Sequence, residues 1–272
     1  MEMIDLSRLE PQETLNHTSK GNQLKWKYYG YWYKADHMGY EGLAETIVSA
    51  LLGKSTVKYP FVAYEYSQIK YKERIYRGCK SADFLADGYD LIPLEKLYRK
   101  FTGGSLAVDT AHQGEITDQI KFLVNFVEQT TGLQEFGRYL TSMLEIDAFF
   151  LNEDRHTNNI AVQYNAADNT YALCPLFDNG LSLLADTNMD FPLERSLEDC
   201  LKTVEAKPFS IYFDDQLDAA EKLYGIQLHF NFSTNDVKAL IDSYRTAYSQ
   251  EICDRCEALI RRQMRHYGYL VQ

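Results

Sequence analysis

The feature that most constrains the fold is a change of pattern near residue 80 of this 272-residue chain. Up to that point the sequence is rich in aromatic, β-prone segments. We predict there a hairpin over residues 23–36, strands over residues 61–69 and 74–78, and one helix over residues 41–52 that ends at Gly53. The first eighty residues therefore read as a sheet with a single helix.

Beyond residue 80 apolar residues recur mostly at helical spacing. We predict helices over residues 93–101, 116–127 and 136–150, with Pro93 in the first turn of the first one. We also predict a surface loop over residues 102–114, short strands over residues 158–163 and 171–177, and further helices from about residue 214 to residue 266. A β-rich lobe at residues 1–80 and a mainly helical lobe at residues 81–272 make an α+β fold of two lobes. The cleft between two such lobes is a natural ligand site.

The charge and the apolar content exclude several classes of partner. A formal net charge of −11 disfavours nucleic acid and anionic membrane surfaces, since both attract stripes of lysine and arginine. No apolar run reaches the roughly 20 residues that span a bilayer, and no secretory signal begins the sequence. Five cysteines at irregular spacing do not form a disulfide framework. We expect a cytoplasmic protein with no membrane span and no nucleic-acid partner.

Three polar residues stand at a spacing that suits phosphoryl transfer. Asp154 and Asn159 lie in one polar stretch after the helix at residues 136–150, and Asp178 follows the second short strand. Phosphoryl transfer needs one carboxylate to orient or deprotonate the acceptor hydroxyl. It also needs an amide oxygen and a second carboxylate to hold Mg²⁺ against the phosphates. Any one of these residues or motifs is common by chance. The interpretation depends on their order along the chain: a helix, the Asp-Arg-His loop, a strand, a turn, a second strand and then Asp-Asn-Gly.

The same stretch resembles the catalytic loop shared by the phosphatidylinositol 3- and 4-kinases and the bacterial HipA-like kinases. Asp154-Arg-His-x-x-Asn159-Ile matches that loop, and Asp178-Asn-Gly resembles the metal-binding turn, with asparagine where the family has an aromatic residue. The resemblance implies a protein-kinase-like fold, ATP and Mg²⁺, Asp154 as the catalytic base, and Asn159 and Asp178 as magnesium ligands. We expect His156 to hold the loop in shape. Lys207-Pro-Phe also resembles a HipA-like feature.

The resemblance extends to the first lobe. Lys34 ends a strand, as the phosphate-binding lysine of these kinases does, and Glu41 is the expected ion-pair partner, with Glu45 as the alternative. Ser19 and Gly21 belong to a segment that could lie over the phosphates or form an ordinary turn. Residues 78–85 are expected to form the hinge that meets the adenine.

Charge separates the candidate substrates. The segment after Asp178 is mainly acidic; it carries Asp186, Asp190, Glu194, Glu198, Asp199 and Glu205 against Arg195 and Lys202. An inositol phosphate headgroup needs positive charge there, whereas a protein segment with lysine or arginine near the acceptor suits an acidic one. We predict a serine/threonine protein kinase of HipA-like type. A lipid kinase and a nucleotide-binding pseudokinase scaffold are the alternatives.

Overall fold

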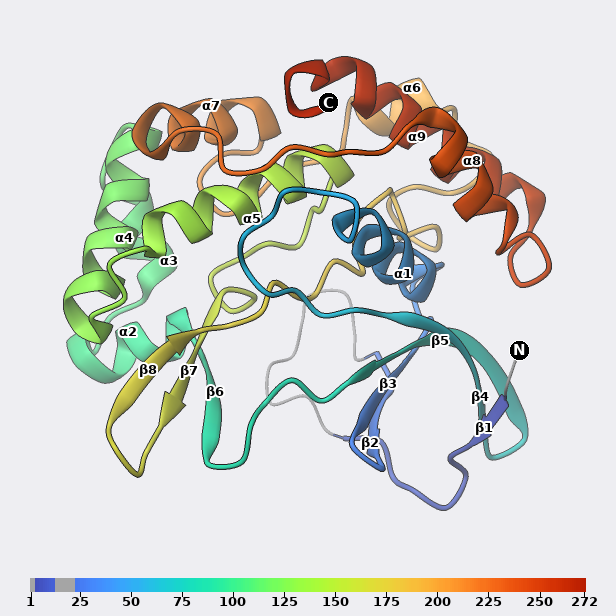
Figure 1. The fold of residues 1–272 in the computed structure, drawn as a ribbon, viewed down its shortest axis with the longest axis horizontal. Coiled ribbons are helices and arrows are strands. Elements are labelled where there is room, and N and C mark those ends of the chain that lie inside the picture. Colours follow the sequence, from blue (N-terminus) through green and yellow to red (C-terminus); the bar gives the residue numbers. More distant parts are fainter. Residues whose placement is uncertain (1–2, 13–22) are drawn as a thin grey trace.

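A five-stranded sheet builds the first lobe of the computed structural model, which describes residues 3–12 and 23–272 (Figure 1). Its strand order is β1-β4-β5-β3-β2, and β1 runs parallel to β4 while the other pairs are antiparallel. The strands are β1 (Met3–Asp5), β2 (Lys25–Tyr28), β3 (Tyr31–Ala35), β4 (Glu65–Tyr71) and β5 (Arg74–Ala82). Tyr29 and Gly30 join β2 to β3 with positive φ angles of 47° and 78°, the conformation that a tight two-residue hairpin requires.

Helix α1 (Glu41–Leu52) lies between this sheet and the helices of the second lobe (Figure 1). It packs on β3, β4 and β5, and all its residues except Ala50 are buried. Two glycines allow the close approach. A Cβ on Gly42 would lie 2.5 Å from the carbonyl carbon of Gly78 in β5, and a Cβ on Gly78 would lie 2.0 Å from the carbonyl oxygen of Lys34. Glycine is therefore required where α1 meets the β3–β5 pair.

A second, three-stranded sheet lies beside the helical part of the chain (Figure 1). It consists of β6 (Tyr89–Pro93), β7 (Ala161–Asn165) and β8 (Thr170–Leu173), all antiparallel. Helix α2 (Leu94–Thr102) begins directly after β6, because Pro93 stands at the position before the first helical residue. This sheet fixes one end of the polar stretch that carries Asp154 and Asn159, since β7 follows that stretch immediately.

The second lobe is built around α5 (Phe136–Phe150), which is buried along almost its whole length. Packed against it are α4, α7 and α9, and a large apolar core joins these helices to α1. The other helices of the lobe are α3 (Leu106–Ala111), α4 (Ile116–Thr131), α6 (Leu197–Leu201), α7 (Phe213–Tyr224), α8 (Thr234–Asp242) and α9 (Gln250–His266). Because α5 is anchored on all sides, the loop that leaves its end starts from a rigid element.

The α+β organisation agrees with the sequence, and several elements differ. A helix, α3, stands inside the predicted loop over residues 102–114, where the Ser105 hydroxyl caps it by accepting the N–H of Val108. Strands β1 and β6 were not predicted, because each is short and is fixed by pairing with a distant strand. Strand β5 continues to Ala82, so the predicted border at residue 80 falls inside it. No helix in the described part of the chain is long and apolar enough to cross a membrane.

Candidate active site

Lys34, near the end of β3, is the centre of a buried ion-pair group at the edge of the first lobe. Its ammonium donates to Glu45 Oε1 at 2.6 Å, to Asp178 Oδ1 at 3.0 Å and to the Tyr64 hydroxyl at 3.3 Å. The side chain is only 12% exposed. The three partners come from α1, from the segment before β4 and from the turn after β8, so one lysine joins both lobes.

The charges of this group stabilise one another. Burial alone would lower the pKa of the Lys34 ammonium, but Asp178 and then Glu45 outweigh it and hold that pKa well above its ordinary value. Burial likewise would raise the pKa of Asp178, yet Lys34 and, to a smaller extent, Lys25 keep it below the usual range of a carboxyl group. Both side chains are therefore charged at neutral pH.

Glu45 connects the lysine to the backbone of the Asp-Asn-Gly turn. While Oε1 accepts from Lys34, Oε2 accepts the backbone N–H of Asn179 at 2.9 Å. Asp178 itself takes a left-handed conformation with a φ of 64°, which is uncommon for a residue other than glycine. The glutamate thus fixes both the lysine and the turn whose carboxylate faces it.

The predicted pairing of Lys34 with Glu41 is wrong. Glu41 opens α1 and folds back over the preceding segment, where its carboxylate accepts the N–H groups of His37, Met38 and Gly39 at 2.6–3.2 Å. All three N–H groups belong to the segment before α1, so the Glu41 carboxylate fixes that segment and does not cap the helix itself. Glu45, one turn later, reaches the lysine.

Asp154 and Asn159 hold each other within the loop after α5. The helix ends at Phe150, and the capping residue Leu151 is left-handed with a φ of 56°. The amide nitrogen of Asn159 donates to the backbone carbonyl of Asp154 at 2.8 Å and to its Oδ2 at 3.0 Å. Since both acceptors are oxygens, the nitrogen of the amide must face them. The amide oxygen of Asn159 is left to point away from Asp154.

Arg155 links this loop to the Asp-Asn-Gly turn. Its guanidinium forms a bidentate ion pair with Asp147 of α5, with hydrogen bonds of 2.8 and 3.0 Å. The remaining donors bond the carbonyls of Asn159 and Phe177 and the side-chain oxygen of Asn179, at 3.0–3.2 Å. Burial would lower the pKa of Arg155, but Asp147 raises it, so the guanidinium stays charged. Through Arg155, the segments that carry Asp154, Asn159 and Asp178 form one unit.

A cavity of about 230 Å³ opens in front of Lys34 and Asp178. Residues from both lobes line it: Lys25, Lys27, Trp32, Lys34, Tyr64, Ser81, Asp83, Phe84, Leu85, Leu91, Phe177 and Asp178. Phe84 and Phe177 meet with ring centroids 5.4 Å apart. Ser81, Asp83, Phe84 and Leu85 of the predicted hinge therefore line the cavity, and Asp83 pairs there with Lys27 at 2.6 Å. One cavity combines an apolar part with a group of lysines.

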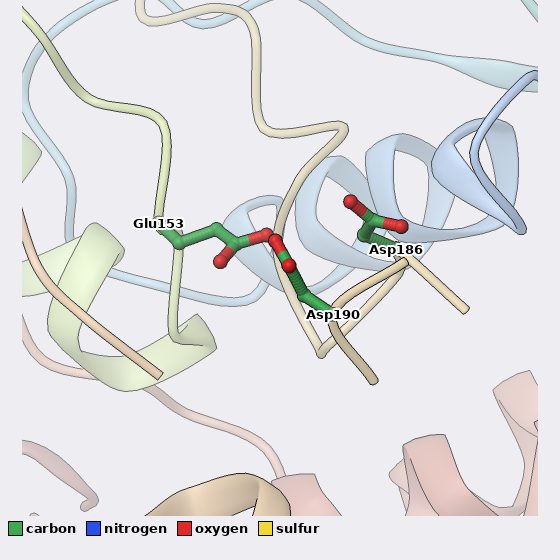
Figure 2. A group of neighbouring side chains, drawn as sticks. All are labelled: Glu153, Asp186 and Asp190. Carbon is green, nitrogen blue, oxygen red and sulfur yellow. The ribbon is translucent and has the colours of Figure 1, made fainter. Parts of the chain in front are cut away.

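A second hollow, of about 330 Å³, lies on the side of the loop where Glu153 and Lys207 stand. Its other lining residues are Asp190, Phe191, Arg195, Thr203 and Glu205. The carboxylates of Glu153, Asp186 and Asp190 gather there, with one oxygen of each within 4.8 Å of the others (Figure 2). Close carboxylates repel one another, and the hollow also carries the cationic side chains of Arg195 and Lys207.

The structure brings the predicted site residues together as two separate pairs and leaves others outside them. Lys34 meets Asp178 directly, and Asp154 meets Asn159 directly, while Arg155 connects the two pairs. Ser19 and Gly21 lie outside the described residues. Sequence reasoning gave no role to Arg155 or its partner Asp147. The sequence did contain one signal for this pair, which is the charged Asp147 in the mainly apolar helix α5. Charged side chains are rarely buried without a partner, so Asp147 indicates that a cation lies nearby.

The chain shares its fold with a solved structure described as the Helicobacter pylori proinflammatory kinase CtkA. The TM-score is 0.64, and the match covers 97% of this chain and 95% of that one at 16% sequence identity. At that identity the likeness concerns the fold. No protein-family model matches the sequence, and no curated protein matches it. The predicted two-lobed, kinase-like fold is confirmed.

Proposed function

We propose that this protein is an ATP-dependent phosphotransferase, a serine/threonine protein kinase of HipA-like type. The observation that carries the proposal is the pairing of Lys34 with Asp178, joined through Arg155 to the Asp154–Asn159 pair. This is the arrangement that phosphoryl transfer requires: a lysine for the phosphates, a metal-binding carboxylate, and a base beside an amide oxygen. The protein of known structure that shares the fold is itself called a kinase.

The lining of the cavity suits the two ends of ATP. Phe84, Leu85, Leu91 and Phe177 would contact the adenine, and Lys25 and Lys34 would meet the phosphates, while Lys27 is paired with Asp83. Lys25 of β2 stands directly opposite Lys34 of β3 in the hairpin, so both side chains point to the same face of the sheet. Like charges at opposed positions destabilise a sheet, and a polyphosphate beside them would remove that cost.

Asn159 and Asp178 would hold Mg²⁺ through their side-chain oxygens. Mg²⁺ prefers oxygen ligands, and the amide oxygen of Asn159 faces away from Asp154 while Asp178 is held as a carboxylate by Lys34. When bound, the ion would neutralise charge on the phosphates. Glu45 and Arg155 keep the two ligand-bearing segments in place, so the protein need not reorganise during transfer.

Asp154 is the proposed base. It would accept the proton of a serine or threonine hydroxyl and point that oxygen at the terminal phosphate. Asn159 fixes the carboxylate through Oδ2, at 3.0 Å, which leaves Oδ1 for the acceptor. Glu153 precedes Asp154 in the chain and lies close to Asp186 and Asp190 in space, and this acidic group would favour a basic residue near that acceptor (Figure 2). The same charges disfavour a phosphorylated lipid headgroup.

Labelled ATP, Mg²⁺ and a generic basic protein test the proposal. The wild type should transfer label to serine or threonine. Asp154→Asn should lose transfer and keep nucleotide binding, because the base does not contact the nucleotide. Asp178→Asn should also weaken Mg²⁺-dependent binding of ATP in a thermal-shift titration.

Three outcomes would contradict the proposal. Equal transfer by the wild type and Asp154→Asn would remove Asp154 as the base. Binding of ATP–Mg²⁺ without turnover on any acceptor would favour the pseudokinase scaffold. Phosphorylation of phosphatidylinositol but not of protein would favour the lipid kinase.

A further inference from the structure

Lys207 stands beside the proposed base although it is far from it in the sequence. Its ammonium lies 3.8 Å from Asp154 Oδ1, and its side chain is 40% exposed. It also lines the 330 Å³ hollow on the side where an acceptor would approach. A permanent cation therefore faces both the base and open space.

The backbone of Lys207 is fixed from two directions. Its carbonyl accepts from the buried side-chain amide of Gln216 in α7 at 3.0 Å, and the same amide accepts the N–H of Phe209 at 3.3 Å. Ala206 donates its N–H to the carbonyl of Ile211 at 2.8 Å, which closes the segment into a loop. The stem of the lysine is thus held in the second lobe while its ammonium projects toward Asp154.

The catalytic loop offers no other permanent cation to the reacting groups. The donors of Arg155 go to Asp147, to Asn179 and to two backbone carbonyls inside the protein. His156 Nε2 lies 3.7 Å from Asp154 Oδ1, but its charge depends on pH. Within the described residues, Lys207 is the one lysine or arginine within 4 Å of the Asp154 carboxylate.

At 3.8 Å, the Lys207 ammonium is too far from Asp154 Oδ1 to form a hydrogen bond with it. A charge-assisted hydrogen bond between an ammonium and a carboxylate is about 2.7–2.9 Å long, and no side-chain hydrogen bond of Lys207 occurs among the described residues. An acceptor oxygen held by Asp154 would attack the phosphorus next to it. Charge spread over the equatorial oxygens of the moving phosphoryl group would then develop within reach of a neighbouring cation.

We propose that Lys207 is a catalytic residue that donates hydrogen bonds to the phosphoryl group during its transfer, an inference that rests on the proposed function. A bond forms between the acceptor oxygen and the γ-phosphorus, and the bond from that phosphorus to the β,γ-bridging oxygen breaks. The electron pair stays on the ADP oxygen, and the hydroxyl proton goes to Asp154. Lys207 keeps its proton throughout.

Steady-state kinetics of Lys207→Ala and Lys207→Arg test this role, with Lys202→Ala as the matched control. Lys202 belongs to the same acidic segment but is 72% exposed and paired with Asp199. Loss of one donor to developing charge costs about 10²–10³ in kcat. We expect a loss of that order in Lys207→Ala, ATP affinity and Tm close to the wild type, partial recovery in Lys207→Arg, and no change in Lys202→Ala.

The pH profile separates contact with the phosphoryl group from an effect on the base. If Lys207 acts only by stabilising the Asp154 carboxylate, Lys207→Ala moves the acidic limb of the kcat profile to higher pH, and the catalytic role is overturned. A profile of unchanged shape with a lower plateau supports it. If Lys207→Ala keeps kcat within threefold while Asp154→Asn is inactive, Lys207 is dispensable and the proposed function survives. A wild type without transfer overturns both.

Discussion

Glu45 Oε2 accepts the backbone N–H of Asn179 at 2.9 Å, across the boundary between α1 and the turn after β8. The other carboxylate oxygen holds Lys34 at 2.6 Å. A single side chain therefore fixes the distance between the lysine of the first lobe and the Asp-Asn-Gly turn of the second. The orientation of α1 sets whether the charged end of the cavity is assembled.

Glu45→Gln should lower phosphotransfer much more than it lowers stability. Glutamine keeps the size of the side chain but removes the charge that faces Lys34, so Lys34 loses one of its two carboxylate partners and the N–H of Asn179 loses a charged acceptor. Misplacement of about 1 Å in a catalytic group can cost about 10²-fold. We expect kcat/KM to fall about 10- to 100-fold, measured with labelled ATP and a basic acceptor protein.

Glu41→Gln is the matched control on the same helix. Glu41 accepts the N–H groups of His37, Met38 and Gly39 in the segment before α1, and a hydrogen bond to a charged group contributes about 1.5–3 kcal/mol. We expect a lower free energy of unfolding in urea and kcat/KM within twofold of the wild type. If Glu41→Gln lost activity as severely as Glu45→Gln, the separation of the two roles would be incorrect.

Arg155→Met should destabilise the whole protein. The change leaves Asp147, which is fully buried, as a charge without its guanidinium partner. Breaking one side of a buried ion pair costs about 3–5 kcal/mol. Urea denaturation followed by circular dichroism measures the loss.

The double variant Asp147→Leu/Arg155→Met checks the cause. Removing both charges should recover part of the loss, because the buried carboxylate is then absent. Additive losses from the two single changes would show that the pair is not the source of the effect.

The sequence predicted elements that depend on local pattern and missed those that depend on distant contacts. Helix α1 was predicted with its observed bounds, because its apolar spacing and the following Gly53 are local signals. Glu41 and Glu45 are four residues apart and share a helix face, so spacing alone could not choose between them. The close contact of Gly42 with Gly78 fixes the position of α1 on the sheet, and only the folded chain contains it.

The residues of the candidate site also fall into those whose contacts are local in sequence and those whose contacts depend on distant packing. Asp154 and Asn159 bond each other within one loop, so their relationship is readable in the sequence. Lys207 reaches Asp154 only because Gln216 and α7 hold its segment against the second lobe. Lys207-Pro-Phe resembles a HipA-like feature, but its spacing does not show that Lys207 lies beside Asp154. Long-range packing decides such pairs, and local spacing does not report it.

The acidic hollow beside Asp154 should set a preference for basic substrates. Asp190 and Glu205 line it together with Glu153, and an exposed charge pair is worth up to about 1 kcal/mol, or roughly fivefold in affinity. We expect an arginine near the acceptor serine to lower KM relative to a glutamate at the same peptide position. The variants Asp190→Asn and Glu205→Gln should each reduce that preference by up to about fivefold.

Glu198→Gln is the matched control for this preference. Glu198 is exposed and paired with Arg262, and it does not line the hollow, so the ratio of the two KM values should not change. Equal KM values for both peptides in the wild type would contradict the role of the acidic hollow in substrate choice.

Stability should fall with rising pH through the titration of Glu145 in α5. Burial raises the pKa of this carboxyl to about 8, against the lowering effect of the Gln227 N–H that it accepts at 2.7 Å. An unfolded glutamate has a pKa of about 4.3. The folded state therefore keeps a proton that the unfolded state has released. This contribution to the free energy of unfolding is complete below about pH 4.3 and is lost as the pH rises through about 8.

Urea unfolding of the wild type and Glu145→Gln at pH 5, 6, 7 and 8 measures that contribution. One unit of pKa shift corresponds to about 1.4 kcal/mol, so the difference in slope between the two proteins is within reach of such titrations. Glutamine does not titrate, and its free energy of unfolding should decline less over this range. Glu135→Gln, at the exposed start of the same helix, should keep the slope of the wild type. Equal slopes for Glu145→Gln and the wild type would mean that Glu145 is ionised in the folded protein, held as a carboxylate by the N–H groups of Gln227 and Leu228.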